Sequence, residues 1–257
     1  MFKPLFFLAM VIVGYLAQFV DGTLGMGYGV FSASLLVSIG LYPVIASASV
    51  HTAEVFTTLL SGVSHFKLGN VKRDLVLSLA IPGVIGGVAG AYFLASVPGE
   101  TIKPFVAAIL LMMGLVILYR FLVRKNPITS ESNGHSRGKL TLLGFVAGFM
   151  DAVGGGGWGP IATPSLILSG NDEPRQVVGS VNLVEFFVTV AETLTFLIIV
   201  GPEAFRWDIV VALLVGGSIA APTAAFLCRK LPAKALGSLI GVALIGLNIR
   251  TLLKFVM

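Results

Sequence analysis

The sequence predicts an all-α protein, a polytopic bundle of transmembrane helices built from two homologous repeats. Three observations lead to this prediction: a composition poor in charge, long apolar runs, and an internal duplication. Of 257 residues, 56% are hydrophobic and 11% are charged, whereas about 25% of the residues of a soluble domain are charged. The mean hydropathy is +0.97. Because the polar side chains are too few to cover a soluble surface, lipid is the expected solvent for most of the exterior.

Six apolar runs are long enough to cross a bilayer, which takes about 20 residues in a helix. Charged or turn-rich stretches separate them, among them Pro98–Pro104 and Asn171–Gln176. The predicted spans are Val44–Phe66, Leu75–Val97, Phe105–Val123, Val177–Val200, Ile209–Cys228 and Ala235–Val256.

Two further apolar regions are interrupted in the middle. Pro4–Gly40 is broken by Asp21 and a run of glycines, and Thr141–Gly170 is broken at Asp151–Gly159. The first piece of the second region is too short to cross the bilayer as a helix. We predict a broken or re-entrant helix pair in each region, because irregular backbone at membrane depth is tolerated only where protein or a water-filled cavity surrounds it.

The most polar stretch of the chain, Arg124–Lys139, contains Pro, Ser, Asn and Gly and is predicted to be a flexible linker. It separates a first transmembrane repeat (1–123) from a second (140–257), with the linker at 124–139. The basic residues lie at the ends of apolar runs, and the positive-inside rule then predicts a cytoplasmic linker in a cell (inner) membrane.

The two halves match in the order of their acidic residues and glycines. A shift of 130 residues superposes Asp21 on Asp151, and a shift of 131 superposes Glu54 on Glu185. The repeats are inverted if each interrupted region is a hairpin, and parallel if each is a single crossing. Both topologies place the same number of basic residues on the cytoplasmic side, so the positive-inside rule does not choose between them. We favour inverted repeats, because Pro4–Gly40 is too long for one crossing.

Each half contains an aspartate followed by a glycine cluster, in the segments DGTLGMGYG and DAVGGGGWG. The glycines let the backbone turn and expose N–H groups at a helix start, which attracts an anion, while the aspartate caps the turn or orients a neighbour. The alternative is that the glycines only allow close helix packing. The substrate-binding residues predicted from these clusters are Asp21, Gly25, Gly27, Tyr28, Gly29, Asp151, Gly155, Gly156, Gly157 and Trp158.

A second polar set follows each cluster, in the segments SVHTAE and SVNLVE. We predict that its hydroxyl, imidazole and amide groups line a polar cavity and bind substrate, and that its glutamates exchange a coupling proton. The alternative is that these groups form interhelical hydrogen bonds. The predicted binding residues are Ser49, His51, Thr52, Ser180 and Asn182, and the predicted proton-coupling residues are Glu54 and Glu185.

Glu185 is predicted to be the better proton carrier. His51 stands beside Glu54, and an imidazolium there would hold that glutamate ionised. The neutral Asn182 stands beside Glu185 and gives no such help. A third intramembrane glutamate, Glu192, has less support, because its counterpart in the first half is Ser61.

Several other functions find no motif in the sequence. His51 is the one histidine in the interior of a predicted span, since His65 lies at the end of a span and His135 lies in the linker. Neither HExxH nor CxxC spacing occurs, so we predict no metal and no cofactor. The single cysteine, Cys228, cannot form an intramolecular disulfide. No GxxxxGK[ST] motif is present, and no basic stripe interleaved with aromatic residues points to nucleic acid.

Taken together, the two halves resemble the sulfite exporter TauE/SafE family of membrane permeases. The resemblance rests on a GF or GY pair, an aspartate, a glycine cluster and a Ser-Val-[His/Asn]…Glu helix, which recur in order in each half. It implies a multi-pass secondary transporter of a small anion, such as sulfite, a sulfonate or a related organosulfur anion. An intramembrane enzyme or a membrane assembly module is the alternative. We expect no enzyme, because catalysis does not explain a polar set in both halves.

Overall fold

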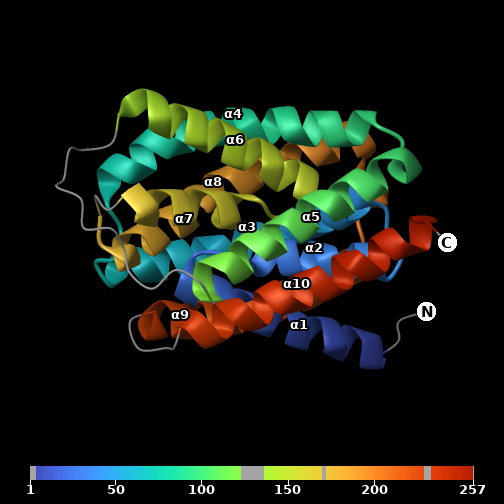
Figure 1. Ribbon diagram of the computed structural model, residues 1–257, viewed down its shortest axis with the longest axis horizontal. Helices are drawn as coiled ribbons and strands as arrows, with labels where there is room; N and C mark the ends of the chain where they lie inside the picture. The colour runs from blue at the N-terminus through green and yellow to red at the C-terminus, as the bar shows by residue number, and fades with distance from the viewer. Residues whose placement is uncertain (1–3, 123–135, 170–171, 229–232, 257) are drawn as a thin grey trace.

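The computed structural model describes residues 4–122, 136–169, 172–228 and 233–256. These residues form ten α-helices and one short 3₁₀ helix, η1 (Pro202–Ala204). The helices lie side by side in one elongated bundle (Figure 1). They are α1 (Pro4–Leu24), α2 (Tyr28–Ser38), α3 (Pro43–Lys67), α4 (Arg73–Ser96), α5 (Gly99–Leu122), α6 (Arg137–Gly154), α7 (Trp158–Ser169), α8 (Pro174–Val200), α9 (Trp207–Leu227) and α10 (Ala233–Val256).

Seven of these helices are long and apolar enough to cross a membrane. Six of them, α3, α4, α5, α8, α9 and α10, cover the six predicted spans except for the last residue of three spans. The prediction of a multi-pass helical protein is therefore confirmed. The seventh is α1, which lies in the first interrupted region.

Three predicted boundaries were wrong by a few residues. Pro98–Pro104 is not a loop, because α5 begins at Gly99; the carbonyl of Pro98 accepts the N–H groups of Thr101 and Ile102. An acidic residue in the first turn of α5 also favours this start. The second boundary is in Asn171–Gln176, which was predicted to separate two spans. Helix α8 already begins at Pro174 within this stretch, since proline suits the first position of a helix.

The third boundary is the end of the linker, because α6 begins at Arg137 and takes up the last three residues of the predicted linker. Residues 124–135 of that linker lie outside the described residues, so its cytoplasmic position stays a prediction.

Both interrupted regions are hairpins of two helices, α1 with α2 and α6 with α7. The turns need glycine, because Gly25 and Gly155 adopt φ values of +69° and +72°. The start of α1 and the end of α10 lie at one end of the bundle, and the end of α5 and the start of α6 lie at the other (Figure 1).

Helices of one half pack mainly against helices of the other half. Helix α1 packs against α9, α6 against α4, α5 against α10, and α3 against α8. The last pair runs antiparallel, because His51 is beside Glu192 while Ser61 bonds Asn182 ten residues further along α3. Since α3 and α8 occupy matching positions in the two halves, these contacts support inverted repeats, which stay our interpretation.

Small residues allow the closest of these approaches. A Cβ atom on Gly86 would lie 2.1 Å from the carbonyl oxygen of Phe145, and one on Gly216 would lie 1.9 Å from that of Val11. The backbones of α4 and α6, and those of α9 and α1, are therefore in direct contact, as in many membrane helix pairs.

We predict that Gly86→Leu and Gly216→Leu each destabilise the protein by about 1–3 kcal/mol or more, because the new side chain cannot fit against a backbone carbonyl. Gly246→Leu is the matched control, since nothing lies within 4 Å of a Cβ atom at this exposed helical glycine. Thermal unfolding in detergent measures the difference. Equal melting temperatures for all three variants would contradict the packing described here.

Candidate functional site

The turns of the two hairpins meet in the centre of the bundle. A Cβ atom on Gly29 would lie 2.5 Å from Cα of Gly156, and one on Gly159 would lie 2.7 Å from the carbonyl oxygen of Gly25. The hydroxyl of Thr163 also donates a hydrogen bond to that carbonyl. Because the two glycine clusters occupy matching positions in the two repeats, we expect them to lie close together, on either side of a cavity. They do lie close together, but no cavity separates them at Gly29 and Gly156, where the backbones touch.

The two aspartates cap the helices that follow these turns. Oδ1 of Asp151 accepts the backbone N–H of Trp158, the first residue of α7, at 3.0 Å. Asp21 makes the matching backbone hydrogen bond with Tyr28, the first residue of α2. Both side chains are buried. A carboxylate at a helix N-terminus is stabilised by the free N–H groups and by the helix dipole.

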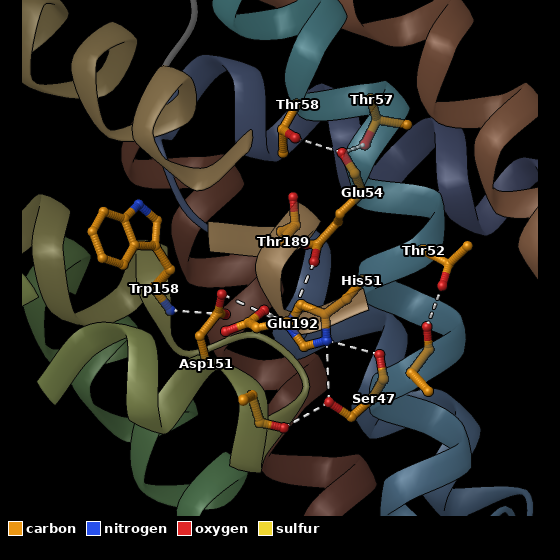
Figure 2. Close-up of polar contacts among 12 residues, drawn as sticks. Ser47, His51, Thr52, Glu54, Thr57, Thr58, Asp151, Trp158, Thr189 and Glu192 are labelled. Atoms are coloured by element: carbon orange, nitrogen blue, oxygen red, sulfur yellow. Dashed lines mark hydrogen bonds and ion pairs between the residues drawn. The ribbon is translucent and has the colours of Figure 1, made fainter. Parts of the chain in front are cut away.

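His51 lies at the centre of a cluster of acidic side chains from three helices. Its Nε2 atom is 2.9 Å from Oε2 of Glu192 on α8, 3.6 Å from Oδ2 of Asp151 on α6, and 3.8 Å from Oε2 of Glu54 on α3. All four side chains are at most 1% exposed. Figure 2 shows the three carboxyl groups gathered around the imidazole ring.

The other face of the His51 ring is fixed by the main chain. Nδ1 lies 2.7 Å from the carbonyl oxygen of Ser47 and donates a hydrogen bond to it. The hydroxyl of Ser47 in turn donates to the carbonyl of Ala152, 2.6 Å away, in the last turn of α6. The ring stacks on Phe196 of α8. These contacts direct Nε2 toward the carboxyl groups.

Both predicted proton-coupling glutamates are buried and incompletely bonded. Neither carboxyl oxygen of Glu54 has a hydrogen-bond partner, and neither does Oε2 of Glu185. The hydroxyls of Thr57 and Thr58 bind the main-chain carbonyl of Glu54 and leave its carboxyl group free. The charged and titratable groups around Glu185 are Asp21, Glu54, Asp151 and His51.

Three side chains bring together the atoms that hold metal ions in proteins. The ligand atoms of His51, Asp151 and Glu192 all lie within 4.8 Å of one another. The sequence analysis predicted no metal site, because it relied on local spacing such as HExxH. These three residues come from three different helices, so no spacing along the chain announces them.

The structure places two predicted binding residues away from this centre. The hydroxyl of Ser49 accepts the backbone N–H of Arg206, just before α9, and that of Ser180 accepts the backbone N–H of Lys72, just before α4. Each serine therefore anchors the start of a long helix in the opposite half, and we leave both out of the proposed site.

The remaining predicted residues make mostly structural contacts. Thr52 donates to the carbonyl of Ala48, and the Asn182 side chain accepts from Ser61 at 2.6 Å. The indole N–H of Trp158 donates to the carbonyl of Val181 at 3.0 Å. The rings of Trp158 and Tyr28 fill the space beside Gly83 and Gly217, respectively.

Sequence reasoning undervalued one residue and missed another. Glu192 has the shortest contact with His51, yet its mismatch with Ser61 argued against it. The repeat comparison favours residues that both halves share, so it hides a group present in one half only. Gln18 of α1 was missed; it is fully buried and both its amide atoms lack hydrogen-bond partners. The signal that could have identified Gln18 is a polar amide side chain within an apolar run.

Comparison with known proteins identifies the family. The model of the sulfite exporter TauE/SafE family matches residues 10–251 of the chain. The chain belongs to this family. A Bacillus subtilis (strain 168) protein named "Probable membrane transporter protein YtnM" is 47% identical over 243 residues, which cover 94% of this chain and 81% of that protein. A second, "Probable membrane transporter protein YdhB" of the same organism, is 25% identical over 181 residues, covering 70% and 73%. No solved structure is significantly similar.

This TauE/SafE protein is accordingly a multi-pass membrane transporter and not an enzyme. Its family and its relatives support that statement, and its seven long apolar helices agree with it. The centre described above, where both hairpin turns and five buried carboxyl groups meet, is its candidate transport site.

We predict that Gly156→Ala impairs folding or transport far more than Gly40→Ala. Both glycines have positive φ, +149° and +114°, so both variants incur backbone strain. Only at position 156 would the Cβ atom also collide with the opposite turn, 2.0 Å from the backbone nitrogen of Val30; nothing lies within 4 Å at position 40. Yield and melting temperature of the purified variants measure the difference. Equal effects would mean that the contact between the turns contributes little.

Proposed function

We propose that this protein is a secondary transporter of a small anion, with sulfite or a related sulfur oxyanion as substrate, and that protons are the coupling ions. The observation that supports this most directly is the meeting of two helix starts, at Tyr28 and Trp158, in the buried centre of the bundle. Each hairpin comes from one half of the chain, which is the arrangement expected where repeats enclose a transport site.

The helix starts offer the anion its binding groups. Helices α2 and α7 begin where the two hairpin turns meet, and the backbone N–H groups at a helix start attract anions. Because Gly29 and Gly156 touch, the turns must separate before an anion of the size of sulfite can lie between them. We infer that the two halves move relative to one another during transport, and that the structure represents a closed state.

The acidic residues make a coupling cation necessary. Among the described residues, the buried polar set includes Asp21, Glu54, Asp151, Glu185 and Glu192 but neither lysine nor arginine. An anion would be repelled from so many ionised carboxylates. Protonation removes this repulsion, and burial in a low dielectric favours the neutral form of a carboxyl group. Coupled binding of anion and proton therefore follows from the charges of the site.

Glu185 is our candidate for the coupling proton. It lies on α8 near the capping aspartate Asp21 and near Glu54, and its Oε2 atom has no hydrogen-bond donor. In the part of the chain that the structure describes, no ion pair joins Glu185 to a histidine, whereas Glu54 lies 3.8 Å from His51. Replacing Glu54 is expected to weaken binding or folding, since it belongs to the His51 cluster.

We predict that an imposed proton gradient drives sulfite across the membrane of proteoliposomes that contain the purified protein. We also predict that Glu185→Gln abolishes the effect of pH on this sulfite flux. The glutamine has the same shape but cannot exchange a proton. Glu203→Gln is the matched control, because Glu203 is an exposed residue of η1. Its flux and pH dependence are expected to equal those of wild type.

Two results would contradict the proposal. Absence of sulfite and sulfonate flux above protein-free vesicles, at every pH and with a folded protein, would exclude the proposed substrate class. A Glu185→Gln variant with the wild-type pH dependence would show that Glu185 is a structural hydrogen-bond partner and that another group exchanges the proton. Flux by the purified protein alone would also exclude a membrane assembly module.

A further inference from the structure

We propose that His51, Asp151 and Glu192, with Glu54 as a fourth ligand, bind one divalent transition-metal ion such as Mn²⁺, Fe²⁺, Co²⁺ or Zn²⁺. The site is a structural element of the bundle centre that joins α3, α6 and α8. This inference rests on the geometry of the four side chains and does not depend on which anion the protein transports.

The spacing of the four ligand atoms fits a shared ion. Bonds of about 2.0–2.2 Å to imidazole nitrogen and carboxylate oxygen place two ligands of one ion roughly 3 to 3.5 Å apart. The observed distances from Nε2 of His51 are 2.9 Å to Glu192, 3.6 Å to Asp151 and 3.8 Å to Glu54. The carboxyl groups point toward His51 in Figure 2 and need only small side-chain rotations to close on one point.

Both the histidine and the aspartate are oriented as metal ligands usually are. Metal-binding histidines almost always donate their other ring N–H to a carbonyl or carboxylate, which fixes the tautomer. His51 does so through Nδ1, which bonds the carbonyl of Ser47 at 2.7 Å. Asp151 is held through Oδ1 by the N–H of Trp158, which leaves Oδ2 directed at the cluster.

The ligand atoms lack other partners. Apart from their contacts with one another, Nε2 of His51, Oδ2 of Asp151, and both carboxyl oxygens of Glu54 and of Glu192 have no hydrogen-bond partner, although all are buried. A buried polar atom without a partner costs about 1–3 kcal/mol, and more if it is charged. A divalent cation would satisfy the inward-facing atoms together and offset most of the charge of the three carboxylates.

The ligand set also indicates which ions fit. One imidazole nitrogen with carboxylate oxygens, and no thiolate, suits borderline metals such as Mn²⁺, Fe²⁺, Co²⁺ and Zn²⁺. Magnesium is a poor candidate, because it prefers oxygen ligands and retains its water molecules.

The second half of the chain provides an internal comparison. Asn182 and Ser61 occupy the positions that match His51 and Glu192, and they form a neutral hydrogen bond of 2.6 Å. The neutral pair satisfies its contact without an ion. Only one of the two matching contacts, His51 with Glu192, is therefore made by titratable side chains. The expected stoichiometry is one ion per chain.

Cobalt binding to the purified full chain tests the site. All proteins would carry His135→Gln, so that the linker histidine cannot contribute, and would have any affinity tag removed and be treated with a chelator. We expect one Co²⁺ per chain, with visible absorption bands, displaced by Zn²⁺. Glu192→Gln and His51→Gln should weaken Co²⁺ binding at least tenfold.

Two controls match these variants. His65→Gln replaces another buried histidine of α3, whose Nε2 atom bonds the carbonyl of Gly22 instead of a carboxylate, and Glu203→Gln removes an exposed carboxylate. Both should bind Co²⁺ as the His135→Gln parent does. This readout is independent of transport, so a protein that binds Co²⁺ but moves no sulfite would refute only the proposed function.

If the His135→Gln parent elutes as a folded species but shows no saturable Co²⁺ binding, this result alone overturns the proposal. Unchanged Co²⁺ affinity in Glu192→Gln and His51→Gln would equally overturn it. If a cluster variant fails to fold, the absorption of the parent decides: bands that indicate oxygen ligands without nitrogen would exclude His51.

Discussion

A carboxylate buried in a lipid-surrounded bundle is unfavourable by several kcal/mol unless a proton, a cation or hydrogen-bond donors compensate its charge. The described part of this protein buries five carboxyl groups in one region, and the rest of its architecture can be understood from how the charge of each is compensated. Asp21 and Asp151 are bonded by helix starts. Glu192 and Glu54 lie with His51. Glu185 is left as the group whose compensation must come from a mobile ion.

The glycine turns make this arrangement possible. Without Cβ atoms at Gly29 and Gly156 the two hairpins approach until their backbones touch, which brings the two capping aspartates and the starts of α2 and α7 into one place. The long helices α3 and α8 then bring His51 and the glutamates to the same region from the opposite side. The close approach of the two halves therefore also brings together the groups that compensate the buried charges.

Sequence reasoning predicted the membrane class, the six long spans and both interrupted regions, because apolar runs and glycine clusters are local signals. It gave two possible roles for Asp151, capping the turn or orienting a neighbour, and the structure shows the first. It did not predict the roles of Ser49 and Ser180, which depend on a helix start in the other half. Glu192 was undervalued for a related reason: its partner, His51, lies 141 residues away on another helix, and its repeat counterpart is a serine. A contact between distant segments that is present in just one of the two repeats cannot be recognised from the spacing or periodicity of the sequence.

The central claim is that an anion can occupy this acidic centre only together with a compensating proton. Reversal potentials measured on proteoliposomes with opposed sulfite and pH gradients test it most directly, since they report how many protons move with each anion. The account predicts a reversal potential that shifts when the pH gradient alone is changed. A reversal potential that follows the sulfite gradient and ignores pH would contradict it.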